Sequence, residues 1–175
     1  VVAVNPANPV GNLTIKQLSD IYTGKIKNWQ EVGGKDQQIV ALSRDRNSGT
    51  HVFFLEHVIK LGEKKNANEF AAAVLMMPSS QAIISEVDAN PAAIGYIGLG
   101  YLTKNEKALA IARPGSSNYV LPSVQTVTKK QYPISRSLLF YTNGVPSGEV
   151  KSFVDYVLSP AGQKIVLKMD FVPLR

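Results

Sequence analysis

An apolar run, a polar loop and a helix-like segment follow one another between residues 39 and 62, and this order constrains the fold more than any other feature. The run Ile39–Leu42 is rich in strand-forming residues. Downstream, Leu55–Ile59 places apolar residues at helical spacing, and Gly62 is a typical helix end. The pattern therefore predicts a strand that enters a helix through the loop Ser43–Thr50.

This loop carries groups that bind a tetrahedral anion. Ser48 and Thr50 offer hydroxyl donors, Gly49 allows close approach of the backbone, and Arg44 offers a planar fork of donors. Asp45 is placed to orient the arginine or balance its charge. The unpaired N–H groups of a helix start and its dipole end, roughly +0.5 of a charge, also favour an anion. The alternative is that Ser48 only caps the helix and Arg44 is a surface charge.

The rest of the chain alternates between helix-like and strand-like segments. Thr14 and Gln17 form a capping box before a helix that ends near Gly24, with Leu13 and Leu18 as a hydrophobic staple. A turn is expected at Gly33-Gly34. Further helices are expected over Asn68–Met76, from Ser79 or Ser80 to Asn90, over Val150–Leu158 and from Ser159-Pro160 to Met169, and strands over Ala93–Ile97 and Leu138–Tyr141.

This alternation predicts an α/β architecture with a partly parallel sheet. The apolar stripes of the helices over Val150–Leu158 and Ile165–Met169 are expected to belong to the core. Between them and the first part of the chain, Arg113–Pro133 is rich in Pro, Gly and Ser and is the candidate linker.

Composition limits the function classes. The 175 residues are 45% hydrophobic and 18% charged, which is typical of a globular chain. No apolar run reaches the roughly 20 residues that span a bilayer. The absence of cysteine excludes disulfides and thiolate metal sites. The net charge of +6 comes from scattered lysines without interleaved aromatic residues, so nucleic-acid binding is not expected.

Motifs for enzymatic chemistry are missing. The glycines of Gly95–Gly100 are in the wrong order for a dinucleotide loop, and Gly34-Lys35 lacks the remainder of a P-loop. His51 and His57 are six residues apart, so they project from different helix faces and cannot share a metal. Ser48 lacks the GxSxG elbow of a hydrolase nucleophile. We therefore expect a protein that is not an enzyme and needs no cofactor or metal.

The order and spacing of short motifs across nearly the whole chain resemble the phosphate-binding proteins of bacterial and archaeal ABC transporters, of the type II periplasmic binding protein superfamily. The matching segments are Val4–Val10, Leu13–Trp29, Gly33-Gly34, Arg44-Asp45 with Ser48-Gly49-Thr50, Asn90–Tyr96, Tyr132–Arg136 and Ser159–Gln163.

The resemblance implies two α/β lobes that close around phosphate. Residues 6–127 would form a nearly complete second lobe with the anion loop, and residues 1–5 and 128–175 part of the first. Arg44 would be the charged donor, Ser48 and Thr50 hydroxyl donors and Gly49 a backbone donor, with Asp45 in a supporting place. The implied partners are inorganic phosphate and an ABC transporter permease. The implied location is periplasmic or extracellular, with a lipid anchor in the full-length protein.

In that family the other lobe contributes an N-terminal Gly-Ser-rich loop, which would precede Val1. We therefore expect this chain to be a fragment or one part of an assembly. The apolar faces of the final helices would then be exposed and would self-associate or be covered by a partner chain.

Three functions remain to be separated. The first is phosphate capture for import. The second is a phosphate-sensing or scaffold domain of the same fold with weak or no transport role, which an incomplete site would favour. The third is a phosphoryl-transfer enzyme, which would need a metal site or a nucleophile.

Overall fold

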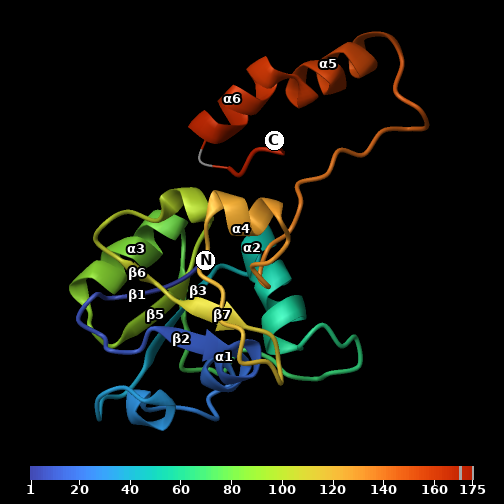
Figure 1. The fold of residues 1–175 in the computed structure, drawn as a ribbon. Helices are drawn as coiled ribbons and strands as arrows, with labels where there is room; N and C mark the ends of the chain where they lie inside the picture. Colours follow the sequence, from blue (N-terminus) through green and yellow to red (C-terminus); the bar gives the residue numbers. More distant parts are fainter. Residues whose placement is uncertain (170, 175) are drawn as a thin grey trace.

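The structure, a computed structural model, describes residues 1–169 and 171–174 (Figure 1). An α/β lobe comes first, and the chain then extends away from it and ends in two further helices. The main sheet of the lobe has five strands, in the spatial order β4 (Leu75–Met77), β3 (Val40–Arg44), β5 (Ala93–Tyr96), β1 (Val2–Val4) and β6 (Lys107–Ala108).

The sheet is mixed. β3 runs parallel to both β4 and β5, whereas β1 runs antiparallel to β5 and β6. A second, parallel sheet pairs β2 (Asn12–Thr14) with β7 (Ala110–Ala112). The prediction of an α/β architecture with a partly parallel sheet is confirmed. The helices are α1 (Ile15–Tyr22), α2 (Gly49–Phe54), α3 (Ser80–Ala89), α4 (Val124–Thr128), α5 (Gly148–Leu158) and α6 (Pro160–Lys168), with short turns η1 (Trp29–Val32), η2 (Leu55–Ile59) and η3 (Leu99–Tyr101).

Helix α1 begins and ends as the sequence predicts. The Thr14 hydroxyl accepts the N–H of Gln17 at 3.1 Å, and the Gln17 side chain accepts the N–H of Thr14 at 2.8 Å. After Tyr22 the chain turns at Gly24, whose φ of 75° suits glycine. The predicted capping box and helix end are therefore confirmed.

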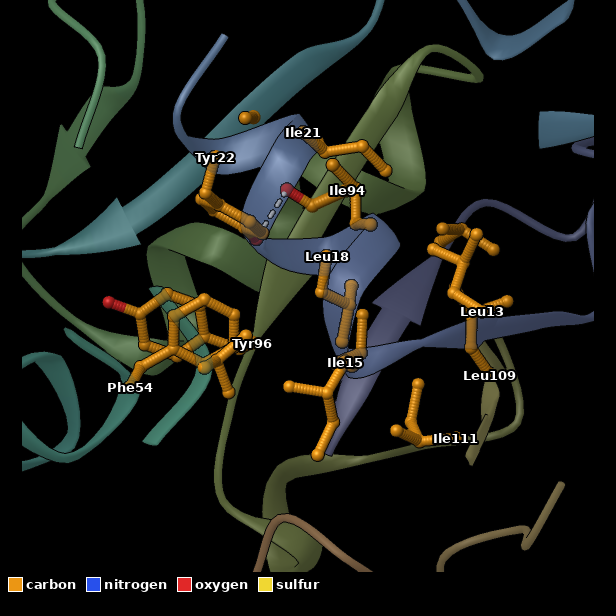
Figure 2. Packing of buried hydrophobic residues seen from close by; sticks show 14 of the residues in the cluster. Leu13, Ile15, Leu18, Ile21, Tyr22, Phe54, Ile94, Tyr96, Leu109 and Ile111 are labelled. Carbon is orange, nitrogen blue, oxygen red and sulfur yellow. Dashed lines mark hydrogen bonds between the residues drawn. The ribbon is translucent and has the colours of Figure 1, made fainter. Parts of the chain in front are cut away.

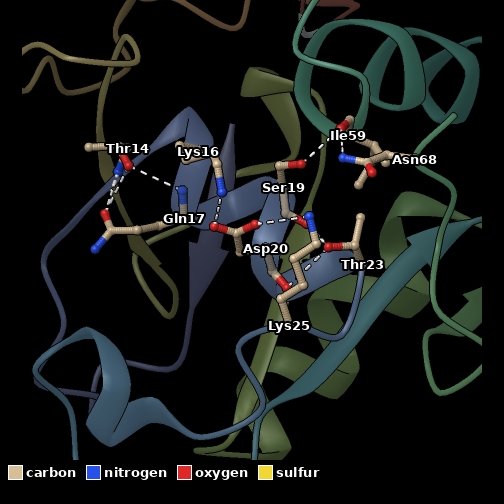
Figure 3. Close-up of polar contacts among 9 residues, drawn as sticks. All are labelled: Thr14, Lys16, Gln17, Ser19, Asp20, Thr23, Lys25, Ile59 and Asn68. Atoms are coloured by element: carbon tan, nitrogen blue, oxygen red, sulfur yellow. Dashed lines mark hydrogen bonds and ion pairs between the residues drawn. The ribbon is translucent and has the colours of Figure 1, made fainter. Parts of the chain in front are cut away.

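Polar contacts fix α1 against the segment that follows α2 (Figure 3). The Ser19 hydroxyl donates to the carbonyl of Ile59 at 2.8 Å, and the Asn68 amide donates to the same carbonyl at 3.2 Å. Ile59 is the last residue of η2, a π-helical turn that continues directly from α2. The helix that leaves the anion loop is thus anchored at its far end.

The core of the lobe lies between α1, the sheets and α2 (Figure 2). The rings of Phe54 and Tyr96 stack with centroids 3.9 Å apart and an interplanar angle of 6°. Tyr22 meets Phe54 edge-on at 4.8 Å, and its hydroxyl lies 3.2 Å from the carbonyl of Leu42. Strand β3, strand β5 and helix α2 therefore meet α1 in one aromatic cluster.

Helix α3 packs closely on the other side of β5. A Cβ atom on Gly95 would overlap the side chain of Ile83, so glycine is required there for the helix to approach the strand. Ser79 caps the helix by accepting the N–H of Ala82 at 3.0 Å. Of the two predicted starting residues, Ser79 is therefore the cap.

The expected helix over Asn68–Met76 is wrong. Its last residues form β4, where Leu75 pairs with Leu42 of β3. The preceding alanine run is held as a turn, because the N–H of Ala71 donates to the carbonyl of Tyr22 at 2.9 Å. Tertiary hydrogen bonds have overridden the helix propensity of alanine.

The expected strand over Leu138–Tyr141 is also wrong. This segment has no regular structure and is exposed, with Tyr141 at 89% of its full accessible surface. A strand needs a neighbour to pair its backbone groups, and the described part of the chain provides none here. Helices α5 and α6 do form where predicted, with Ser159 and Pro160 at the start of α6.

The apolar stripes of α5 and α6 are not core, contrary to expectation. Val150, Phe153 and Leu158 are 51–59% exposed, and Ile165 is 48% exposed. These two helices contact each other but lie apart from the lobe in Figure 1. The exposure agrees with the expectation that the apolar faces of the final helices lack a partner in this chain.

The candidate linker Arg113–Pro133 is only partly irregular. It contains α4, whose start is capped by Ser123, and it ends with Tyr132, which is buried in the lobe core at 2% exposure. This stretch therefore packs on the lobe. The division of the chain at residues 5 and 127 stays a prediction, and the structure adds that Val2–Val4 run inside the sheet of the lobe.

Two properties of the described residues bear on function. None of their helices combines the length and apolar character needed to cross a membrane. Within the same residues, no group of three or more His, Asp or Glu side chains could hold a metal ion.

Candidate anion-binding site

The anion loop lies where the carboxyl ends of two parallel strands meet. β3 ends at Arg44 and β4 at Met77, which are partners in the register of the sheet. Helix α2 begins a few residues after the first strand and α3 directly after the second. Ligands of α/β sheets bind at this edge, because helix starts and their free N–H groups gather there.

Ser48 organises the start of α2. Its N–H donates to the carbonyl of Asp45 at 2.9 Å, and its hydroxyl accepts the N–H of Thr50 at 3.2 Å. Ser48 is thus the helix cap, as the alternative interpretation of the sequence predicted. A hydroxyl that accepts one hydrogen bond still has a proton to donate, so capping leaves Ser48 able to bind an anion.

Arg44 does not extend into solvent. Its Nη1 donates to the hydroxyl of Ser80 at 3.2 Å and its Nη2 to the carbonyl of Pro78 at 3.4 Å. Its Nε is buried and has no partner among the described residues. The guanidinium therefore joins the end of β3 to the start of α3.

Asp45 is held through its backbone. Its N–H donates to the carbonyl of Met77 at 3.2 Å, and its own carbonyl accepts the N–H of Ser48. No ion pair joins its carboxylate to Arg44, both side chains being in the described part of the structure. The expected role of Asp45 in orienting the arginine stays a prediction.

A buried chain of hydrogen bonds supports the loop from below. The backbone N–H of Arg44 lies 3.3 Å from the hydroxyl of Tyr96, which lies 2.6 Å from the hydroxyl of Ser43. The Ser43 hydroxyl in turn lies 3.0 Å from Nδ1 of His51. The Ser43 hydroxyl also donates to the carbonyl of Arg44 at 3.1 Å, so both backbone polar groups of Arg44 belong to this network.

His51 is packed in the interior of the lobe. Burial lowers the pKa of its imidazole, and the ring stacks on Phe70 with centroids 4.6 Å apart. At 5% exposure it cannot reach a substrate as a general base. His57 lies on another face and contacts the carbonyl of Phe53 at 3.1 Å. The two histidines are therefore structural residues, and His51 occupies the predicted first turn of the helix.

Sequence reasoning missed three residues near the loop. Ser80 accepts a hydrogen bond from the guanidinium of Arg44, and Ser43 belongs to the buried chain of hydrogen bonds. Arg136 reaches the loop from the segment after α4, with its guanidinium beside Gly49. Ser43 was part of the loop motif, and Arg136 was part of a matching segment, but only the folded chain shows where their side chains lie.

The arrangement gathers hydrogen-bond donors at one edge of the sheet. Ser48, Gly49 and Thr50 are together at the helix start, and Arg44 is at the neighbouring helix start. The imidazole of His51 contacts the hydroxyl of Ser43 beneath the loop, at 3.0 Å.

Comparisons with known proteins identify the family of this chain. The family model of the PBP superfamily domain matches residues 1–161. The phosphate-binding protein PstS of Bacillus subtilis is 35% identical over 98% of this chain. A structure from Clostridium perfringens, described as a phosphate ABC transporter substrate-binding protein with bound phosphate, has a TM-score of 0.79 and 36% identity over 99% of this chain. An ABC-type phosphate transport receptor from Vibrio cholerae has a TM-score of 0.80 and 30% identity over 98% of it.

The chain spans only part of these relatives. It covers 54% of the Bacillus protein, 68% of the Clostridium chain and 67% of the Vibrio chain. All three are described as phosphate-binding or phosphate-transport proteins, in agreement with the expectation that this chain is a binding protein and not an enzyme. The family model and the similar structures show that the chain belongs to the PBP superfamily, among the phosphate-binding proteins of phosphate ABC transporters.

Proposed function

We propose that the chain binds inorganic phosphate at Ser48, Gly49 and Thr50, with Arg44 as the charged donor, and serves phosphate delivery to an ABC transporter permease. The observation that carries this proposal is the capped helix start at the carboxyl edge of β3, in a chain 36% identical to a protein solved with phosphate bound. Fixed N–H and O–H groups would replace water around the anion. The location that follows is periplasmic or extracellular, with a lipid anchor in the full-length protein.

Arg44 would change partners when phosphate binds. Its hydrogen bonds to Ser80 and Pro78, at 3.2 and 3.4 Å, are at the long end of the normal range. A charge-assisted hydrogen bond to phosphate would be stronger than either. The partnerless Nε adds a donor that a small movement could direct at the anion.

Thr50→Ala is expected to weaken phosphate binding by about 10- to 100-fold, because a hydrogen bond to a charged group is lost. Isothermal calorimetry with phosphate and with sulfate measures the effect. Thr50 is a cleaner position than Ser48, whose replacement would also remove the helix cap. Thr142→Ala, at an exposed threonine in the segment before α5, is the matched control and should bind as the wild type does.

Unchanged phosphate affinity in both Thr50→Ala and Arg44→Ala would remove these residues from the site. A sensor or scaffold domain remains the second candidate, because the chain spans about half of its Bacillus relative and so offers one part of a closed site. Phosphate affinity as tight in this chain alone as in a full-length relative would count against it.

The exposed C-terminal face, formed by Leu138–Tyr141, α5 and α6, needs a partner. We propose that it packs against polypeptide of the kind that the relatives carry outside the matched region. An apolar surface of this extent marks a protein interface. Its residues include Leu139 at 67% and Phe153 at 59% exposure.

The isolated chain is therefore expected to self-associate through this face, with a sedimentation coefficient that rises with concentration. Phe153→Glu should reduce the association, because it places a charge in the interface. Leu121→Glu is the matched control, since Leu121 is 58% exposed on the lobe. A concentration-independent monomer with slow amide exchange over Leu138–Tyr141 would contradict the proposal.

A further inference from the structure

Arg136 lies against the anion loop although it is distant in the sequence. The segment that carries it is fixed to the lobe by Tyr132, which is buried at 2% exposure, and by Ile134, which packs on the core. From there the side chain reaches α2. Its guanidinium carbon is 5.6 Å from the centre of the Phe53 ring, within the range of a cation–π contact.

The same guanidinium occupies the space beside Gly49. A Cβ atom on Gly49 would lie 3.0 Å from Nη2 of Arg136 and 3.6 Å from Nη1. The glycine has an ordinary negative φ, so its backbone conformation does not require glycine. The lack of a side chain instead leaves room for the arginine at the first residue of the helix.

The charge of Arg136 has no counterpart in the described structure. No carboxylate of residues 1–169 or 171–174 forms an ion pair with it. Arg136 is exposed, so water solvates its charge, and a positive group beside the loop would attract an anion bound there. The second guanidinium near the loop is thus placed where a bound anion would compensate it.

We propose that Arg136 is a further anion-binding residue of the loop, which donates from its guanidinium to an oxygen of the phosphate bound at Ser48, Gly49 and Thr50. This inference rests on the proposed function. The cation–π contact with Phe53 restrains the guanidinium, so less conformational entropy is lost when phosphate arrives. The residue also joins the loop to the segment that leads to the C-terminal helices.

The test is titration of inorganic phosphate, followed by calorimetry and by the NMR shifts of the Gly49 and Thr50 amides. Arg136→Gln is expected to weaken binding about 10- to 100-fold, the loss of a charged hydrogen bond. Arg136→Lys should recover part of the affinity, because the charge returns without the planar fork. Arg46→Gln is the matched control, since it removes the same charge from an exposed position of the same loop and should cost less than about threefold.

The outcomes separate this inference from the proposed function. Equal affinities of Arg136→Gln and Arg46→Gln, with the loss in Thr50→Ala intact, would overturn the role of Arg136 and leave phosphate binding in place. A lower melting temperature of Arg136→Gln with unchanged phosphate affinity would also overturn it, since Arg136 would then only pack on Phe53. A wild-type chain that binds no phosphate at millimolar concentration would overturn both.

Discussion

Replacing Phe54 with alanine is expected to lower the free energy of unfolding by about 3–5 kcal/mol, the range for truncating a buried aromatic residue. Phe54 is 2% exposed and stacks on Tyr96 at 3.9 Å, while Tyr22 meets it edge-on. The variant loses this apolar burial and also three aromatic pairs, with Tyr22, Phe70 and Tyr96, and it leaves a cavity between α2, α1 and β5. Urea denaturation followed by circular dichroism measures the change.

The same substitution should weaken phosphate binding under conditions where the protein remains folded. Phe54 is the last residue of α2, and Tyr96, on which it stacks, also contacts the backbone N–H of Arg44. Val52→Ala is the matched control, because Val52 lies on the same helix at 44% exposure and should change neither stability nor affinity by much. A loss of less than about 1 kcal/mol for Phe54→Ala would mean that the aromatic cluster does not anchor the loop.

Trp29→Ala is expected to have an effect of similar size, about 3–5 kcal/mol. The indole is 1% exposed, and its Nε1 donates to the carbonyl of Ala92 at 2.9 Å. That carbonyl directly precedes β5 and also accepts the N–H of Val40 at 3.0 Å, so the variant loses apolar burial and one of the two hydrogen bonds to this carbonyl. The same denaturation experiment measures the loss.

The variant Trp29→Phe separates the contribution of the buried ring from that of the indole hydrogen bond. It keeps most of the apolar ring but removes the indole donor, so it should cost about 0.5–1.5 kcal/mol, because the carbonyl of Ala92 keeps the N–H of Val40 as a partner. Phosphate affinity should be nearly unchanged in this variant, because Trp29 packs beneath the start of β5 and away from the loop. Equal losses in Trp29→Phe and Trp29→Ala would show that the hydrogen bond, and not the burial of the ring, sets the energy.

Local signals predicted the parts of the fold that depend on local chemistry. The capping box of Thr14, the serine caps of α2 and α6, and the turn at Gly33 with its φ of 85° all form as expected. Each of these depends on hydrogen bonds or backbone angles within a few residues, so the sequence contains the needed information. The candidate loop was found for the same reason.

Segments whose structure depends on distant partners were predicted wrongly. The segment Asn68–Met76 contains an alanine run of high helix propensity, but the last residues of the segment pair with β3 and form β4. Leu138–Tyr141 has high strand propensity, but no described strand lies beside it. Propensity is worth tenths of a kcal/mol per residue, so a few tertiary hydrogen bonds, or their absence, decide the outcome.

The sequence alone determined that an arginine, two hydroxyls and a glycine stand between a strand and a helix, because strand, loop and helix start are adjacent in the chain. Only the tertiary structure decided which groups surround them. It brings Ser80 to Arg44 and Arg136 to Gly49, over 36 and 87 residues of separation, and it buries His51 beneath the loop. Such contacts arise from the packing of helices on a shared sheet edge, and no spacing within the loop encodes them.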